Sequence, residues 1–272
     1  MRIITEPTVE LISRTEFLGS TTFDIPEDGD QYTRLGSFAA KVCYDSKGKA
    51  GRPNVENQRA VLEHRHGSVL EHINFGLYIT GVTRGLTLEL NRHRSFAISQ
   101  RSTRYTAEED ASIVLDPYYT SLYTKYGHFT SAPVEDDISG VEDCNMGELR
   151  LLDGHLTSLR DSFNAYRNEV ERLTTLNPNN LSGFELRKWC RGKARNLLPH
   201  SLESRGVWTN NVRGWRWFIE SRSDAHAEPE IRRLADRVLC VLYKEAPLYF
   251  GDFSSSHTVD GIPVWIPTYH KV

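Results

Sequence analysis

The chain has 272 residues, of which 39% are hydrophobic and 25% are charged, a composition typical of a folded globular protein rather than a collagen-like, fibrous or disordered one. Its formal net charge of −3 excludes a general positive field for non-specific nucleic-acid binding, so an anion must be bound by a local cluster of charges. No apolar run approaches the roughly 18 residues of a membrane span, and the amino-terminal sequence lacks the apolar core of a signal peptide. We therefore expect a cytoplasmic protein without a membrane or nucleic-acid partner.

The amino-terminal part is predicted to contain two strands and two helices. The expected elements are a strand at 8–12, a loop at 21–30, helices at about 31–43 and 53–67, and a strand at 73–80. The last strand has the clearest signal, because alternate residues from Ile73 to Ile79 are apolar and would bury one face.

Residues 83–94 have apolar side chains at helical spacing, which predicts an amphipathic helix that ends in Arg92, His93 and Arg94. One arginine at the carboxyl end of a helix is explained by the helix dipole. Three consecutive residues that can carry positive charge indicate an anionic group nearby.

Residues 116–148 are first aromatic and then acidic and have no sustained period, so we predict a surface insertion around 117–150 that could act as a lid. The rest of the chain is mainly helical, with helices predicted at 147–175, 183–198, 211–222 and 228–249 and a short strand at 205–209. The elements together predict a helix-rich α+β protein with a mixed or antiparallel sheet, folded as a single domain over residues 1–272.

Four cysteines lie far apart and form no Cys-x-x-Cys pair, namely Cys43, Cys144, Cys190 and Cys240. This spacing disfavours a zinc ribbon and a disulfide framework, so we expect reduced thiols that are usually small buried residues. Whether one of them is a nucleophile stays open. The group His64, His66, Glu71 and His72 matches no strong zinc template, and we predict no metal site.

The densest chemical cluster is the segment RHRSFAISQRSTRY at residues 92–105. Its four arginines, with hydroxyls, an amide and an imidazole, suit a ligand that carries a phosphate and planar polar rings, because guanidinium groups bind phosphate oxygens in pairs and stack on rings. A solvated basic turn is an equally good reading of the composition.

Two further clusters lie in the predicted carboxyl-terminal helices. Lys188, Arg191 and Arg195 recur at helical spacing on one side of a helix, where they form either an anion site or a salt-bridged surface. Residues 210–228 combine three arginines with two tryptophans and could bind a flat ring, although tryptophans at helical spacing are more often core residues. No GxGxxG, GxxxxGK[ST] or GxSxG motif occurs, so Rossmann, P-loop and hydrolase-elbow sites are unsupported.

Together these clusters resemble the flavin-dependent thymidylate synthases, whose signature begins Arg-His-Arg and ends Ser-x-Arg, here RHRSFAISQRSTRY. The preceding block HGSVLEHINFGLYITGVTRGLTLELNRHR and the following block KARNLLPHSLESRGVWTNNVRGWRWFIESRSDAHAEPEIRRLA resemble the family in order and spacing. The resemblance implies an α+β homotetramer whose FAD and dUMP sites are built from several subunits.

The resemblance also implies roles for individual residues. Those at FAD-binding positions are Ser68, Arg92, His93, Arg94, Gln100, Asn211 and Arg213, and those at dUMP-binding positions are Glu89, Gln100, Ser102, Arg104, Tyr105, Arg195 and Arg222. Arg222 matches the catalytic arginine that lies against the uracil and favours ionisation of its ring nitrogen 3. Ser102, also expected at the catalytic centre, would complete the phosphate cradle.

The reaction implied by the resemblance is the methylation of dUMP to dTMP without a cysteine nucleophile. Methylenetetrahydrofolate would supply the carbon, and a flavin reduced by NADPH would supply the hydride. A hydroxymethylase, in which water captures the methylene group, and a non-catalytic nucleotide- or RNA-binding module are the alternatives.

The chain departs from the family pattern at three places. Ala97 stands at the first signature serine, Ser99 and Gln100 replace the usual Asn-Glu pair, and Trp217 stands at an FAD-contacting position. The indole of Trp217 could stack on the isoalloxazine or the adenine of the cofactor.

Overall fold

The computed structural model describes residues 2–272 except 49, 109–110, 131–144 and 256. The chain forms two compact units, each assembled from several segments. The first unit comprises Met1–Glu6, Gly81–Thr87 and Gln100–Ser204, and the second comprises Pro7–Thr80, Leu88–Ser99 and Arg205–Val272. The chain therefore passes repeatedly between the units, and neither is a continuous stretch of sequence.

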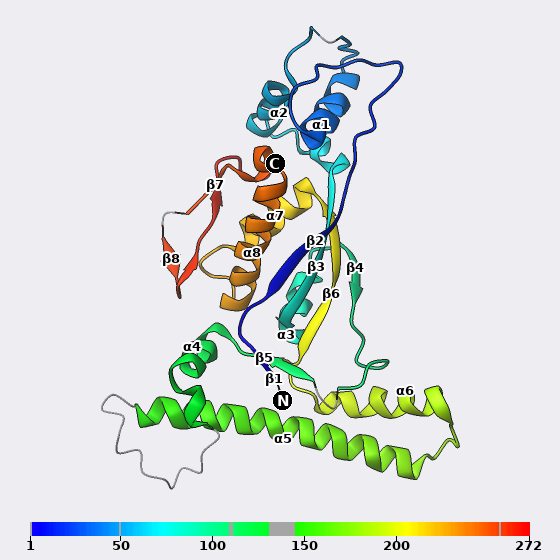
Figure 1. The fold of residues 1–272 in the computed structure, drawn as a ribbon, viewed down its shortest axis with the longest axis vertical. Helices are drawn as coiled ribbons and strands as arrows, with labels where there is room; N and C mark the ends of the chain where they lie inside the picture. Colours follow the sequence, from blue (N-terminus) through cyan, green and yellow to red (C-terminus); the bar gives the residue numbers. More distant parts are fainter. Residues whose placement is uncertain (1, 49, 109–110, 131–144, 256) are drawn as a thin grey trace. The chain divides into compact units, whose positions relative to one another are not determined.

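A four-stranded sheet, most of whose residues belong to the second unit, has the strand order β2-β3-β6-β4 (Figure 1). Its strands are β2 (Thr8–Arg14), β3 (Asn74–Thr83), β6 (Glu203–Asn211) and β4 (Ala97–Gln100). Strands β2 and β3 pair antiparallel, with a register shift between Leu11 and Ser13.

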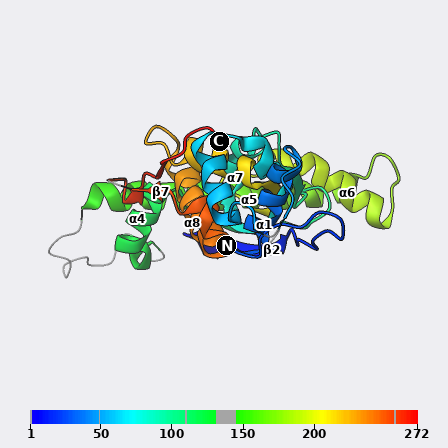
Figure 2. The ribbon, with the colours of Figure 1, turned by 90° about the horizontal axis from the view of Figure 1, so that it is seen from above.

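The helices of the second unit include α7 and α8, which lie side by side in both views (Figures 1 and 2). Its helical elements are α1 (Gln31–Val42), α2 (Asn54–Glu63), the 3-10 helix η1 (Gly67–His72), α7 (Val212–Arg222), α8 (Pro229–Glu245) and α9 (Pro247–Phe250). Two short hairpins follow, β7 (Phe253–Ser254) with β10 (Ile266–Pro267) and β8 (Thr258–Val259) with β9 (Ile262–Pro263). The buried indole of Trp215 donates to the carbonyl of Phe75 at 3.0 Å, which fixes α7 to β3.

The first unit is mainly helical. It contains β1 (Arg2–Ile4) parallel to β5 (Ser112–Val114), most of α3 (Arg84–Leu90), α4 (Pro117–Tyr126), η2 (Gly127–Phe129), α5 (Met146–Leu176), α6 (Gly183–Ala194) and η3 (Arg195–Leu197). Leu152, Leu156 and Phe163 lie on one face of α5 and pack into its apolar core. Asn145 caps α5 by accepting hydrogen bonds from the backbone of Gly147 and Glu148.

The α+β prediction is confirmed, and the predicted strands and helices occur, with several ends displaced. Three predicted helices stop early for local reasons. The helix expected to reach residue 67 ends at Glu63, where Arg65 adopts a left-handed φ of 57°. Helix α6 ends at Ala194, before the extended Leu198 that precedes a proline, and Pro247 separates α8 from α9 because it excludes the residue before it from helical geometry.

The sequence did not predict the short strands β1, β4 and β5, helix α4 or the two hairpins near the carboxyl end. The predicted insertion around 117–150 contains α4, η2 and the start of α5. Its residues 131–144 lie outside the described part of the chain, so the prediction of a lid stays untested.

Candidate active site

The Arg-His-Arg triplet lies in a turn, not at the end of a helix as predicted. Helix α3 ends at Leu90, and residues 91–96 form successive turns. Two side chains from β6 hold them, since Trp208 Nε1 donates to Asn91 Oδ1 at 3.1 Å and Asn210 Nδ2 donates to Ser95 Oγ at 2.9 Å. These tertiary bonds outweigh the helical pattern of the sequence and present the triplet from a fixed loop.

This turn and α7 together enclose a hollow of about 480 Å³. We call it the arginine pocket, and its lining residues are Arg92, His93, Arg94, Ser95, Trp217, Ser221 and Arg222. Arg92 and Arg94 are exposed, and neither forms an ion pair with any residue that the structure describes. Their guanidinium groups are therefore available to an anionic ligand.

Arg222, at the end of α7, is held at two of its nitrogen atoms. Its Nε donates to Nε2 of His93 at 2.9 Å, and its Nη1 lies 3.2 Å from Oε2 of Glu89. Burial, and then the charge of Arg222, lowers the pKa of His93 to about 4. His93 is consequently neutral near pH 7 and can accept this hydrogen bond.

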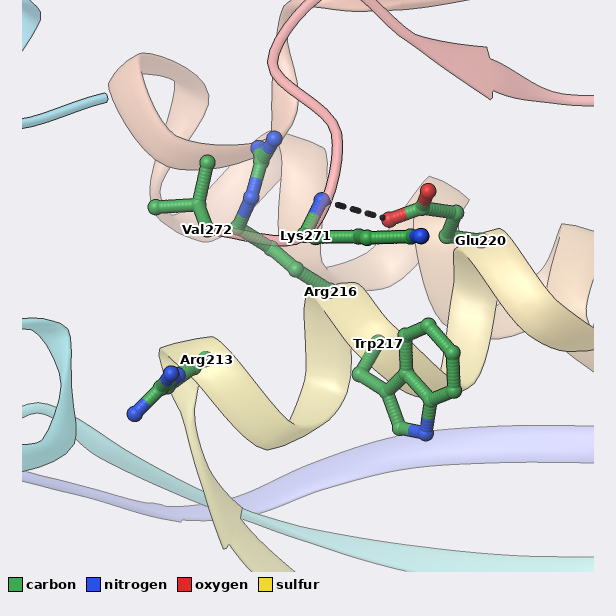
Figure 3. Close-up of a pocket in the computed structure, with 6 residues that line it drawn as sticks. All are labelled: Arg213, Arg216, Trp217, Glu220, Lys271 and Val272. Carbon is green, nitrogen blue, oxygen red and sulfur yellow. Dashed lines mark hydrogen bonds between the residues drawn. The ribbon is translucent and has the colours of Figure 1, made fainter. Parts of the chain in front are cut away.

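A second hollow, of about 320 Å³, shares Trp217 with the arginine pocket (Figure 3). It is lined by Arg213, Arg216, Trp217 and Glu220 of α7 and by Lys271 and Val272. The indole of Trp217 is 49% exposed and lines both hollows, whereas Trp215 belongs to the core. The sequence could not distinguish these two tryptophans.

Arg216 is unavailable to a ligand, although it belongs to the cluster at residues 210–228 for which the sequence left a flat-ring site open. Its guanidinium is buried and forms a double ion pair with Asp252, with distances of 2.5 and 2.9 Å. It also donates to the carbonyls of Tyr249 and Tyr269. Arg216 therefore ties α7 to the carboxyl-terminal segment and has a structural role.

Three residues expected at FAD lie near the start of α7 and on η1. Asn211 caps α7 through a 2.8 Å bond from the backbone of Gly214, and Arg213 Nη1 lies 2.6 Å from Glu71 Oε1. Ser68 is exposed on η1. A Cβ atom on the preceding Gly67 would lie 2.8 Å from Nε of Arg213, so the absence of a side chain lets η1 approach this arginine.

The remaining predicted residues lie in the first unit. Gln100 Nε2 donates to the hydroxyls of Thr87 and Ser204, each at 2.8 Å, and Ser102 Oγ accepts from the backbone of Arg104 at 3.3 Å. The amide of Gln100 is thus fixed by its neighbours.

Tyr105 begins a stack of aromatic and cationic groups on α6. Its ring is parallel to that of Phe184, with centroids 6.0 Å apart, and the ammonium of Lys188 lies 5.7 Å from the centroid of Tyr105. Arg191 donates to the Tyr105 carbonyl at 3.1 Å. Phe184 had no sequence signal, whereas Lys188 and Arg191 belonged to the predicted basic face.

Arg195 follows α6 and is exposed. Burial, and next the positive charge of Arg195, lowers the pKa of Arg84. Arg104 lies against the same helix, with its Nε 3.8 Å from the position of a Cβ on Gly192. The first unit therefore gathers several cations on and beside α6, as the spacing of Lys188, Arg191 and Arg195 predicted.

The predicted site residues are divided between the two units. The group in the second unit is Ser68, Glu89, Arg92, His93, Arg94, Asn211, Arg213 and Arg222, and the group in the first is Gln100, Ser102, Arg104, Tyr105 and Arg195. No sequence pattern indicated that the Arg-His-Arg turn is held by Asn91, Ser95, Trp208 and Asn210. Only the Asn-Asn pair before α7 offered a local signal.

Within the part of the chain that the structure describes, no three His, Cys, Asp or Glu side chains are grouped so that they could hold a metal ion. No helix among the described residues has both the length and the apolar character that crossing a membrane requires.

Comparisons with known proteins agree with the resemblance seen in residues 92–105. The chain is 37% identical to a flavin-dependent thymidylate synthase of Mycobacteroides abscessus over 261 residues, which cover 95% of this chain and 94% of that protein. It is 35% identical to proteins of the same name from Mycolicibacterium gilvum and Mycobacterium tuberculosis, with 94% of this chain and 93% of each relative covered. The family model described as thymidylate synthase complementing protein matches residues 29–248. The chain therefore belongs to the family of thymidylate synthase complementing proteins.

Proposed function

We propose that this protein is a flavin-dependent thymidylate synthase that methylates dUMP to dTMP. The names of its relatives support this activity. The observation that carries it is the position of Arg222, which is fixed between His93 and Glu89. The pocket that it lines also has an exposed indole and two arginines that form no ion pair within the described part of the chain. Such a pocket suits an anionic ligand with planar rings.

We infer that the flavin is FAD. FAD carries a pyrophosphate and two planar ring systems, which match the exposed guanidinium groups of Arg92 and Arg94 and the exposed side chain of Trp217. Arg213 and Asn211 would hold further polar groups of the cofactor. When bound, the flavin supplies the hydride that completes the methyl group, and NADPH is the proposed reductant.

The proposed role of Arg222 is electrostatic. Carbon 5 of uracil is a poor nucleophile until negative charge builds up in the ring, and a fixed guanidinium beside nitrogen 3 and oxygen 4 stabilises that charge. Carbon 5 then takes its one-carbon unit from methylenetetrahydrofolate. Because Arg222 is already oriented by two acceptors, it need not reorganise as the charge develops.

We further propose that Arg104 and Arg195 neutralise the dUMP phosphate, with Ser102, Gln100 and Tyr105 as its other polar contacts. This phosphate site is supported by the several cations on and beside α6, where the like charges of Arg84 and Arg195 lie near each other. An anion in this region would relieve that repulsion.

We propose a cytoplasmic homotetramer in which the two units act as one domain. Leu88 is 57% exposed and Ile98 is 38% exposed, and both lie in the segment Leu88–Ser99 of the second unit. A subunit interface would cover such apolar side chains. Light scattering should give a mass four times that of the chain.

The experiment that tests the proposed function combines the purified protein with FAD, dUMP, methylenetetrahydrofolate and NADPH, and identifies the nucleotide by mass spectrometry. We expect dTMP. Hydroxymethyl-dUMP as the only product would establish the hydroxymethylase instead. A protein that gains no flavin absorbance and forms no product would favour a non-catalytic nucleotide- or RNA-binding module.

We predict that no cysteine is required for this reaction. Cys190 is fully buried, whereas Cys43 and Cys240 are exposed, contrary to the expectation of buried thiols. Partial desolvation raises the pKa of the Cys240 thiol, which disfavours its nucleophilic form. Replacing each of Cys43, Cys144, Cys190 and Cys240 with serine should leave dTMP formation measurable. Complete loss of activity in one variant with an intact circular-dichroism spectrum would restore the cysteine-nucleophile mechanism. Cys144 lies outside the described residues and is included so that every thiol is tested.

We predict that Trp217 contributes to FAD affinity by stacking. Stacking of a base on an aromatic side chain is worth about 1–3 kcal/mol, so Trp217→Asn should raise the Kd for FAD by about tenfold or more, and Trp217→Phe by less. Titration of the apoprotein with FAD, followed by flavin absorbance and tryptophan fluorescence, measures both. Trp265→Phe is the control, because Trp265 bonds to Asp236 and lines neither hollow. An unchanged Kd in Trp217→Asn would refute the stacking role.

A further inference from the structure

The hydrogen bond between His93 and Arg222 has a defined direction. The Nε atom of an arginine carries a hydrogen at all physiological pH values and can only donate. At a separation of 2.9 Å, Nε2 of His93 must therefore accept, and the neutral ring carries its hydrogen on Nδ1. This tautomer follows from the partner and requires no further assumption.

The imidazole that accepts this bond is held on its other sides by aromatic rings. Its centroid lies 5.3 Å from that of Phe218 and 6.0 Å from that of Phe96, both in edge-to-face geometry. Phe96 in turn packs against Trp215 at 4.6 Å. The Asn210–Ser95 bond fixes the turn from which His93 projects, so the acceptor has one position.

Glu89 alone could not fix the plane of the Arg222 guanidinium. The two side chains are 22% and 37% exposed, and a partly exposed ion pair at 3.2 Å leaves a long arginine side chain able to rotate. A second, neutral acceptor at Nε defines the plane without adding a second negative charge. The other N–H groups of Arg222 stay available at the arginine pocket, which this residue lines.

We propose that His93 is a positioning residue for Arg222, and that its imidazole Nε2 fixes the plane in which the guanidinium meets the uracil. This inference rests on the proposed function of Arg222. It differs from the role that the resemblance implies, in which His93 holds FAD.

The positioning of Arg222 and the binding of FAD can be distinguished by measuring kcat and the Kd for FAD. His93→Phe keeps an aromatic ring between Phe96 and Phe218 but removes the acceptor. We expect kcat for dTMP formation at saturating FAD to fall about 100-fold, as when one preorganised contact of a catalytic group is lost, with the FAD Kd changed less than about threefold. His93→Gln restores an acceptor oxygen and should recover about tenfold of the lost rate.

Arg94→Ala is the matched comparison, because Arg94 lies in the same turn but has no ion pair with a described residue. This variant should lose FAD affinity, by about tenfold, as expected for a charged contact to phosphate. If His93→Phe also loses FAD affinity and recovers its full kcat at saturating FAD, His93 is a cofactor ligand and our inference is overturned.

A nuclear magnetic resonance measurement reports the bond without using activity. In protein labelled with ¹⁵N, Nε2 of His93 should have the chemical shift of an unprotonated, hydrogen-bonded nitrogen at pH 7, and the Nε–H signal of Arg222 should move in His93→Phe. An Arg222 signal that does not move in a folded His93→Phe would overturn the inference. If His93→Phe does not fold, the wild-type spectrum decides, since a protonated Nε2 of His93 at pH 7 would also overturn it. If the wild type forms no dTMP, the proposed function fails together with this role, whereas an active wild type with a fully active His93→Phe refutes the role of His93 alone.

Discussion

Replacing Arg222 with alanine is expected to lower the rate of dTMP formation by about 100- to 1,000-fold, the usual cost of removing one preorganised donor from developing negative charge. The fold should survive. The side chain is 22% exposed, and of its two partners His93 lines the pocket and Glu89 has a side chain that is 37% exposed, so neither would be left deeply buried. Initial rates at saturating FAD and dUMP, together with a thermal melt, measure the two effects.

Two further variants show whether the lost rate is specific. Arg222→Lys keeps the charge but not the planar donors, so it should stay well below the wild type. Arg205→Ala removes an exposed arginine of β6 that forms no ion pair with a described residue, and it should have a normal rate. A near-normal rate in Arg222→Ala would refute the electrostatic role.

Replacing Arg216 with alanine is expected to lower the free energy of unfolding by about 3–5 kcal/mol, because it leaves the Asp252 carboxylate, whose side chain is only 10% exposed, without its cation. It also leaves the carbonyls of Tyr249 and Tyr269 without their donor. Urea denaturation of the protein without FAD measures the loss.

Arg213 offers a matched control, since it lies on the same helix three residues earlier. Its ion pair with Glu71 is 47% exposed on both sides, so Arg213→Ala should cost only about 0–1 kcal/mol of stability in the absence of ligand. Equal destabilisation of the two variants would contradict the distinction between a structural and a ligand-facing arginine.

Much of the fold follows from local patterns. The alternation from Ile73 to Ile79 predicted β3, and the helical spacing of the residues after 147 predicted α5, because each pattern buries one continuous face. The predicted end of α3 was wrong because tertiary hydrogen bonds compete with the helix. Trp208 and Asn210 on β6 bind the residues that would have continued it. The strands β1, β4 and β5 are only three or four residues long and are too short for a pattern to show.

The residue types of the candidate site could be predicted from the sequence, but not which of its side chains bond to each other. The arginine-rich segment indicated a ligand with phosphate, and the resemblance then named Arg222 from another part of the chain. The bond between Arg222 and His93 joins residues 129 positions apart, and no local spacing encodes it. The spacing of residues also could not show that Arg216 is buried while the next residue, Trp217, is exposed. Which side chains of α7 are buried depends on how this helix packs on β3.

The central claim is that Arg92, Arg94, Arg222 and Trp217 form one pocket for a flavin and a uridine nucleotide. A crystal structure of the protein with FAD and dUMP tests it most directly. We expect FAD phosphates beside Arg92 and Arg94, a cofactor ring on Trp217, and the uracil against Arg222. Ligands bound elsewhere, with these four side chains directed into solvent, would contradict it.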